Sequence, residues 1–265
     1  MNLINLKNTV AVVTGGSSGI GLATVQLLLQ SGAAVAFCGR DEKRLRDAEA
    51  GLRADFPEAR LYAAPCNVLD AADMQRFAAD SARVLGAASI LVNNAGQGRV
   101  STFADTEDSA WTEELHLKFF SVIYPTRAFL PQLQRQPSPA IVCVNSLLAS
   151  QPEPHMVATS AARAGIKNLV RSMATEFAPS GVRVNGILVG LIESGQWRRR
   201  FAVREDQALD WAAWTGELAA RKRIPLGRLG LPQEAARAIF FLATPLSSYT
   251  TGSHIDVSGG LSHHA

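Results

Sequence analysis

Cysteine is scarce in this chain of 265 residues, which has only Cys38, Cys66 and Cys143 and no Cys-x-x-Cys pair. An odd number of scattered cysteines excludes a disulfide framework and the usual ligand pattern of a zinc site. We therefore expect three reduced thiols, no bound metal and a cytoplasmic protein.

Strong charge and long apolar runs are also absent. Lys and Arg exceed Asp and Glu by only three residues, 26 against 23, and so small an excess does not indicate nucleic-acid binding. No apolar stretch is long enough to cross a bilayer, and the first residues form no charged leader with an apolar core behind it. We expect neither nucleic acid nor a membrane as a partner.

What the chain does contain is a regular alternation of short apolar segments with amphipathic ones. Repeated strand–helix units require parallel strands with right-handed crossovers. The sequence therefore predicts an α/β class, single-domain Rossmann fold over residues 1–265, with a doubly wound parallel sheet of about seven strands and helices on both faces. The expected strands are 9–13, 33–38, 60–64, 89–92, 140–145, 182–188 and 253–257, and the expected helices are 22–29, 41–54, 69–85, 108–133, 156–177 and 232–243.

A glycine-rich turn follows the first expected strand and opens the first helix. It reads Thr14-Gly15-Gly16-Ser17-Ser18-Gly19-Ile20-Gly21. Glycines let the backbone approach a pyrophosphate, and free N–H groups at the start of a helix attract its charge. We predict a dinucleotide site here, with contacts from Gly15, Ser17, Ser18, Gly19 and Ile20.

This turn resembles the opening Thr-Gly-x-x-x-Gly-x-Gly motif of the short-chain dehydrogenase/reductase family. The segment Asn93-Asn94-Ala95-Gly96 is identical to another motif of that family, and residues 189–194 are similar to its Pro-Gly-x-x-x-Thr motif, with Val189 in place of Pro. The resemblance extends from Asn5 to Gly260 and implies hydride transfer between a nicotinamide cofactor and a carbonyl or alcohol. It implies further cofactor contacts from Asn93, Ala95, Gly96, Gly190, Ile192 and Ser194.

The end of the second strand indicates which nicotinamide cofactor is used. It reads Phe37-Cys38-Gly39-Arg40-Asp41, without the carboxylate at the strand end that binds the ribose hydroxyls of NAD(H). A guanidinium suits a 2′-phosphate, so Arg40 favours NADP(H), unless it pairs with Asp41 instead. Asn67, followed by Val68, stands where the family usually has Asp near the adenine, and its amide can both donate and accept there.

The catalytic positions are where the chain departs from the family that it resembles, which uses Asn, Ser, Tyr and Lys. Ser146 is retained, but the Tyr position falls on Thr159, the Lys position on Arg163 and the Asn position on Lys118. A Thr hydroxyl ionises far above the pKa of Tyr, and its oxygen falls roughly 4 Å short of a phenol oxygen. Arg163 stays protonated, although it can still donate to the ribose of the cofactor.

Another group must then supply the proton for a reduction. Lys118 is one candidate, because repulsion from Arg163 lowers the pKa of its ammonium; the alternative is a solvent-facing lysine. His155 is a second candidate, unless it is a surface histidine. The third is a water held by Ser146 and Thr159, with Arg163 stabilising the alkoxide. The residues alone leave these three routes open.

We expect the substrate near Gln97, Gly98 and Arg99 and under a lid formed by residues 193–224. Aromatic and arginine residues are frequent in this lid segment: Trp197, Arg198, Arg199, Arg200, Phe201, Trp211 and Trp214. They suit a bulky or acidic carbonyl or alcohol substrate. The alternative is an amphipathic helix pair that packs its Trp residues and exposes its Arg residues.

Two functions are consistent with these patterns. The first is an NADP(H)-dependent short-chain oxidoreductase with an atypical catalytic centre, and the second is a catalytically degenerate NADP(H)-binding sensor or subunit. The resemblance also implies a homodimer or homotetramer, paired through the expected helices at 108–133 and 156–177.

Overall fold

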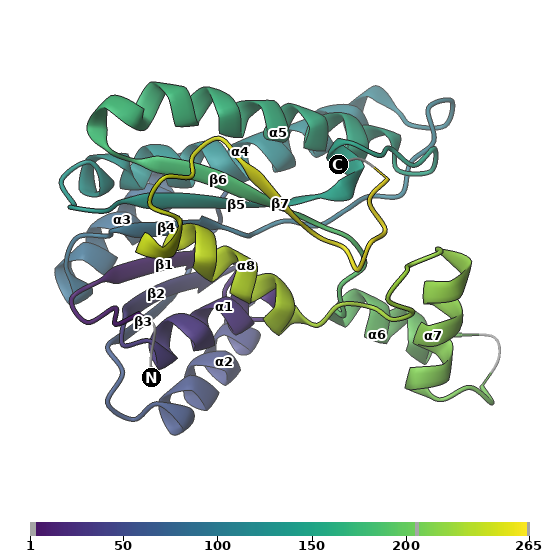
Figure 1. The fold of residues 1–265 in the computed structure, drawn as a ribbon, viewed down its shortest axis with the longest axis horizontal. Coiled ribbons are helices and arrows are strands. Elements are labelled where there is room, and N and C mark those ends of the chain that lie inside the picture. Colours follow the sequence, from purple (N-terminus) through teal and green to yellow (C-terminus); the bar gives the residue numbers. More distant parts are fainter. Residues whose placement is uncertain (1–3, 205–206, 264–265) are drawn as a thin grey trace.

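A seven-stranded parallel sheet lies at the centre of the protein, whose computed structural model describes residues 4–204 and 207–263. The strand order is β3-β2-β1-β4-β5-β6-β7 (Figure 1), which confirms the predicted doubly wound α/β fold. The strands are β1 (Val10–Thr14), β2 (Ala34–Gly39), β3 (Leu61–Pro65), β4 (Ile90–Asn93), β5 (Ala140–Ser146), β6 (Arg183–Val189) and β7 (His254–Val257).

Helices cover both faces of this sheet, as predicted (Figure 1). One face carries α1 (Gly19–Gln30), α2 (Glu42–Asp55) and α8 (Pro232–Ala243), and the other carries α3 (Ala71–Leu85), α4 (Asp108–Leu133) and α5 (Val157–Phe177). The chain winds outward from β1 to β3 and then returns to β4 on the other side of β1. The loops after β1 and β4 therefore diverge, and ligands of such folds bind in the crevice at that point.

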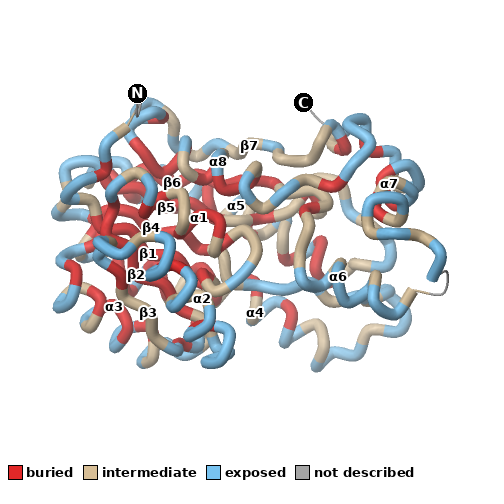
Figure 2. The backbone as a smooth tube through the Cα atoms, turned by 90° about the horizontal axis from the view of Figure 1, so that it is seen from below, coloured by how far each residue is buried: buried red, intermediate tan, exposed pale blue. Residues whose placement is uncertain are grey.

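The strands are apolar on both faces because helices bury each of them. All five residues of β1 are buried, and Phe37 and Phe129 are completely buried in the layers on either side of the sheet. Figure 2 shows buried chain concentrated in the strands and the inner helix faces, with exposed residues on the outer turns. This packing fixes the strand ends from which the site residues project.

Helix boundaries differ from the predicted ones mainly at the first turns. α1 begins at Gly19 and not at residue 22, because the glycine-rich turn already closes helical hydrogen bonds: the Leu22 N–H donates to the Ser18 carbonyl over 3.2 Å. α4 spans the predicted residues and continues through Pro125. Within the described residues, no helix combines the length and apolarity needed to span a bilayer.

Two short helices, α6 (Gly195–Ala202) and α7 (Trp211–Arg221), lie apart from the main layers, past the end of β6 (Figure 1). They contribute to a small third apolar cluster that also contains Leu147 and Leu188 from the ends of β5 and β6. The segment expected to form a lid is therefore anchored at the edge of the sheet where the strands end.

Candidate active site

The glycine-rich turn between β1 and α1 has a backbone conformation that residues with a side chain could not adopt without strain or a clash. Gly15 and Gly19 have φ angles of 65° and 55°, in the left-handed region that favours glycine. A Cβ on Gly21 would lie 2.2 Å from the carbonyl oxygen of Gly15. The turn therefore needs glycine at all three positions to fold back tightly over the start of α1.

The turn after β4 braces this glycine-rich turn. The Asn94 side-chain amide donates to the carbonyls of Thr14 and Gly15 over 3.0 and 3.1 Å, and the Thr14 hydroxyl accepts from the backbone N–H of Ala95 over 3.1 Å. Asn93, in contrast, turns its amide into the protein, where it donates to the Thr126 hydroxyl over 3.1 Å. Any contact of Asn93 with a ligand would therefore come from its backbone.

The N-terminus of α1 has the features of an anion site. Ser18 is the N-cap residue, but its hydroxyl makes no capping bond, and a Cβ on Gly19 would meet no atom within 4 Å. Half-buried Ser17 lies against Gly39 at the end of β2, and Ile20 is also half-buried. Open space, a free hydroxyl and helix N–H groups together fit a pyrophosphate.

Arg40 lies at the other end of this crevice and makes no ion pair with any described residue. The predicted alternative partner, Asp41, caps α2 by accepting from the Arg44 N–H over 3.0 Å and pairs with the Arg44 guanidinium at 3.4 Å. The Arg44 N–H bond is also the main cause that lowers the pKa of Asp41. The guanidinium of Arg40 is thus available for a phosphate.

The structure brings Arg40 together with four other predicted cofactor contacts around one small pocket. It is lined by Arg40, Asn67, Val68, Ala95 and Gly96, among others. The side-chain oxygen of Asn67 accepts from the Leu69 N–H over 3.1 Å, which leaves the side-chain N–H groups of Asn67 available. A larger cleft of about 350 Å³ adjoins this pocket through shared residues, including Arg40 and Gln97.

The predicted nicotinamide segment follows β6. The Gly190 N–H donates to the Val257 carbonyl over 3.0 Å, and Ser258 packs so closely that a Cβ on Gly190 would lie 3.0 Å from it. Ile192 is buried. Ser194 is the N-cap of α6 and accepts from the Trp197 N–H over 3.5 Å. Packing and hydrogen bonds thus hold residues 190–194 in place after β6, far along the chain from the glycine-rich turn.

A buried ion pair occupies the predicted catalytic region. The Lys118 ammonium lies 2.6 Å from the Glu114 carboxylate, and the two side chains are only 3% and 2% exposed. The ammonium also donates to the Gln97 carbonyl. Lys118 is therefore not the solvent-facing lysine of the alternative prediction.

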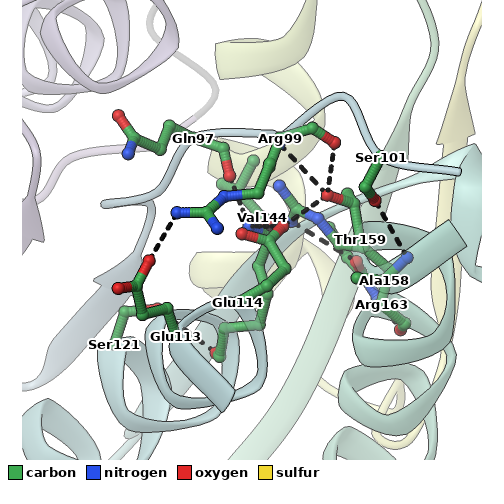
Figure 3. A network of polar contacts seen from close by, with 12 residues as sticks. Gln97, Arg99, Ser101, Glu113, Glu114, Ser121, Val144, Ala158, Thr159 and Arg163 are labelled. Carbon is green, nitrogen blue, oxygen red and sulfur yellow. Dashed lines mark hydrogen bonds and ion pairs between the residues drawn. The ribbon is translucent and has the colours of Figure 1, made fainter. Parts of the chain in front are cut away.

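Thr159, at the Tyr position of the related motif, points into the same network (Figure 3). Its hydroxyl donates to the Glu114 carboxylate and accepts from the Arg99 N–H, the latter over 3.2 Å. The residue is 1% exposed. Because the hydroxyl proton is engaged with a carboxylate, Thr159 braces the segment after β4 and has no proton free for a substrate.

The other two predicted catalytic residues are Arg163 on α5 and Ser146 at the end of β5. The Arg163 guanidinium donates to the Val144 carbonyl over 3.1 Å, while its Nε is buried without a hydrogen-bond partner among the described residues. The Ser146 hydroxyl accepts from the Leu148 N–H over 3.3 Å, which leaves its proton available. No hydrogen bond joins Ser146 to Lys118, Thr159 or Arg163 in the described chain.

Burial and charge shift the acidity of the two cations. Burial, and then repulsion from Arg163, lower the pKa of Lys118 to about 8, although Glu114 acts in the opposite direction. Burial lowers the pKa of Arg163 to about 10, again opposed by Glu114. An ammonium that titrates near neutral pH can donate a proton under ordinary conditions, whereas the guanidinium remains charged.

Sequence reasoning missed Glu114, the carboxylate that joins these groups. Its spacing from Lys118, one helical turn on the same face of α4, was the signal that could have identified it. His155, which we also considered, is exposed and lies 3.1 Å from the Glu153 carboxylate. Its position supports the surface histidine and not a role in the buried centre.

Aromatic side chains of α6 and α7 pack against each other. The rings of Trp211 and Trp214 stack with centroids 5.8 Å apart, and Phe201 meets Trp211 edge-on at 5.3 Å. Arg198 stacks over Trp211 at 3.6 Å and pairs with Glu193 at 3.3 Å. The segment is thus a helix pair with packed aromatics, and its three consecutive arginines, Arg198, Arg199 and Arg200, are exposed.

Known proteins share this architecture. The chain matches the family model described as enoyl-(acyl carrier protein) reductase over residues 15–262. It is 32% identical to an uncharacterized short-chain type dehydrogenase/reductase of Sinorhizobium fredii, over 98% of this chain and 99% of the relative. It is 30% identical to the 3-oxoacyl-(acyl-carrier-protein) reductase of Vibrio harveyi, over 97% and 99% of the two chains.

Solved structures give a more specific match. A short chain oxidoreductase from Pseudomonas aeruginosa PAO1 containing an atypical catalytic center is similar in its apo form, with 75% identity, a TM-score of 0.97 and coverage of 98% of this chain and 100% of that chain. Its NADPH-bound form has 73% identity, a TM-score of 0.96 and coverage of 99% and 100%. The L-sorbose reductase of Gluconobacter frateurii, complexed with NADPH and L-sorbose, has 28% identity, a TM-score of 0.93 and full coverage of both chains.

Proposed function

Because this chain belongs to the short-chain dehydrogenase/reductase family and is an NADP(H)-dependent oxidoreductase with an atypical catalytic centre, we propose that Lys118 is its proton donor. The substrate is a small molecule whose carbonyl or alcohol exchanges a hydride with the nicotinamide. In the reducing direction, Lys118 supplies the proton that the developing alkoxide requires. The observation that carries this proposal is the buried Lys118 ammonium at the Asn position of the related motif, 3% exposed and 2.6 Å from the Glu114 carboxylate; burial and the charge of Arg163 lower its pKa.

The site fits NADP(H) at both ends. The open N-terminus of α1, with Ser18 and Gly19, suits the pyrophosphate, and Arg40 suits the 2′-phosphate. When bound, the nicotinamide supplies or accepts the hydride. The full set of proposed cofactor contacts is Gly15, Ser17, Ser18, Gly19, Ile20, Arg40, Asn67, Val68, Asn93, Ala95, Gly96, Arg163, Gly190, Ile192 and Ser194.

The remaining catalytic roles follow from which groups are free. Ser146 has an available hydroxyl proton and polarises the substrate carbonyl. Arg163 stabilises negative charge on the oxygen, because its guanidinium stays protonated and its Nε lacks a partner among the described residues. Thr159 positions the centre through Glu114 and Arg99. Lys118 is then the one member of this set with an acidity suited to proton transfer near neutral pH.

Replacing Lys118 tests the proposal. We expect Lys118→Arg, which keeps the charge beside Glu114 but cannot release a proton, to lower kcat for NADPH-dependent reduction by about 100-fold or more. The dissociation constant for NADPH should stay near the wild-type value. Lys43→Met removes an exposed lysine that pairs with Asp47 and serves as the control. Full turnover by Lys118→Arg across the pH range would overturn the assignment.

We also propose that residues 193–224 act as a substrate lid for a bulky or acidic carbonyl or alcohol. The exposed arginines of α6 support this, because guanidinium groups bind carboxylates and phosphates. Arg199→Ala should raise KM for acidic substrates about 10-fold and leave KM for neutral ones unchanged. Arg46→Ala, on the distant helix α2, is the matched control. Equal effects on both substrate classes would argue against a charge-selective lid.

We further propose a homodimer or homotetramer in a reducing, cytoplasmic setting. A row of ring contacts along α4 supports assembly: His116, Phe120 and Tyr124 follow one another at centroid distances of 4.6 and 4.7 Å, and His116 is exposed while the other two are half-buried. The three cysteines are all free and buried, which supports a reducing compartment. Analytical ultracentrifugation tests the assembly: Phe120→Glu should shift the protein toward monomer, and an unchanged sedimentation coefficient would contradict this interface.

A further inference from the structure

Glu114 occupies none of the positions that the related motifs assign to catalysis, yet it lies at the centre of the network. One carboxylate oxygen, Oε1, accepts from both the Lys118 ammonium and the Thr159 hydroxyl. Figure 3 shows the side chain reaching from α4 toward Thr159 on α5. The carboxylate thus links the two helices that carry the altered catalytic positions, and it is 2% exposed.

The charges around Lys118 show why a carboxylate is needed there. Three charged groups face the ammonium: Glu114 from its own helix, Arg163 from α5 and Arg99 from the segment after β4. Two of these are cations, and both disfavour the protonated amine. Without Glu114, a buried ammonium would face two guanidinium groups and no counter-ion, and it would lose its proton more readily.

Glu114 also borders the cleft next to the ion pair. The cleft of about 350 Å³ is lined by Glu114 together with Gln97 and Arg99, and the Lys118 ammonium bonds the Gln97 carbonyl at this border. A proton that enters from the cleft therefore meets the Glu114 side chain at this border. From there the Lys118 nitrogen is 2.6 Å away, within hydrogen-bond distance.

We propose that Glu114 is the positioning residue of the catalytic centre, which keeps the Lys118 ammonium charged and returns a proton to it from the cleft after each reduction. The inference rests on the proposed role of Lys118. The alkoxide takes one proton from Nζ and leaves a neutral amine. Glu114 takes one proton from solvent and passes it to that amine, so that the carboxylate and the ammonium are restored and one solvent proton is consumed per turnover.

The test compares Glu114→Gln with Glu176→Gln, which removes an exposed carboxylate near the C-terminal end of α5. We expect Glu114→Gln to move the alkaline limb of the kcat profile for reduction to lower pH by about one unit. The Glu176→Gln profile should overlay that of the wild type. In parallel, the Lys118 titration is followed in the ligand-free protein by NMR of lysine Cε, with the resonance assigned from its loss in Lys118→Met. This titration should move with the kinetic limb.

Glu114→Asp is the second variant and provides the test if Glu114→Gln does not fold. It retains the charge and shortens the arm, so its limb should stay at the wild-type pH while the plateau rate falls. An unmoved Lys118 titration in Glu114→Gln, or a limb that shifts equally in Glu114→Asp, would overturn the role of Glu114. Retention of the alkaline limb by Lys118→Arg would instead refute the role of Lys118, whatever the Glu114 variants do.

Discussion

The Asn94 side-chain amide donates to the Gly15 carbonyl over 3.1 Å and so ties the turn after β4 to the turn after β1. Asn94→Ala leaves this carbonyl without its partner, and we expect the free energy of unfolding to fall by about 1–3 kcal/mol. NADPH binding should weaken as the glycine-rich turn loosens. Urea denaturation and NADPH titration measure the two effects. Asn168→Ala, at an exposed position on α5, is the control; equal behaviour of the two variants would contradict the bracing role.

Two glycines in neighbouring helices should respond to alanine in opposite ways. A Cβ at Gly21 would lie 2.2 Å from the Gly15 carbonyl oxygen, whereas a Cβ at Gly51 in α2 would meet nothing within 4 Å. We expect Gly21→Ala to disrupt NADPH binding and lower the melting temperature. Gly51→Ala should stabilise the protein by about 0.5–1 kcal/mol, because alanine favours the helix. Thermal melts with and without NADPH measure both effects. An unchanged melting temperature and unchanged NADPH binding in Gly21→Ala would refute the close packing of the turn.

Removal of Arg40 should change the preference between cofactors. Arg40→Ala deletes a guanidinium that no described carboxylate neutralises. We expect KM for NADPH to rise about 10-fold or more, since a charge-assisted bond contributes about 1.5–3 kcal/mol, while KM for NADH stays unchanged. Arg46→Ala is the control for the general loss of one positive charge near this site. The Arg46 side chain lies on α2 and pairs with Glu42. An equal rise in KM for NADPH and for NADH would show that Arg40 does not bind the 2′-phosphate.

His254 on β7 should make stability depend on pH. Burial, followed by repulsion from Lys167 and Arg171, lowers the pKa of this histidine to about 4. The unfolded chain binds the proton near pH 6.5, so it takes up more protons than the folded chain between about pH 6.5 and pH 4. Stability therefore falls as the pH decreases through this window. The loss between pH 7 and pH 5, measured by urea denaturation, should be smaller for His254→Gln; equal losses in both proteins would exclude the histidine as a cause.

Motifs fixed by local backbone geometry were predictable from sequence. The glycine-rich turn, Asn94 and Arg40 depend on a strand end and on the residues directly after it, and the structure places them as the spacing indicates. The seven strands were also predictable, because parallel strands covered on both faces appear as short apolar runs. Helix starts were less precise, since the first turn of a helix resembles the turn that precedes it.

The interior of the catalytic centre was only partly predictable. Register placed Lys118 and Thr159 at the site, but it did not show that their polar groups meet through Glu114, because that contact depends on how α4 and α5 pack. The orientation of the Thr159 hydroxyl toward Arg99 depends on the path of an irregular segment, which has no periodicity to read. Pairwise spacing along one helix indicates Glu114 and Lys118 as neighbours; only the packing shows that both are buried.

The contacts that hold residues 97–99 have a consequence for how this protein can diversify. Lys118 bonds the Gln97 carbonyl, which every residue type provides, and Thr159 bonds the backbone N–H of Arg99, which every residue type except proline provides. The Gln97 and Arg99 side chains line the cleft and can be exchanged without loss of these two bonds. Substitutions at position 97 can therefore change the substrate range alone, whereas substitutions at position 99 also remove a cation that faces Lys118.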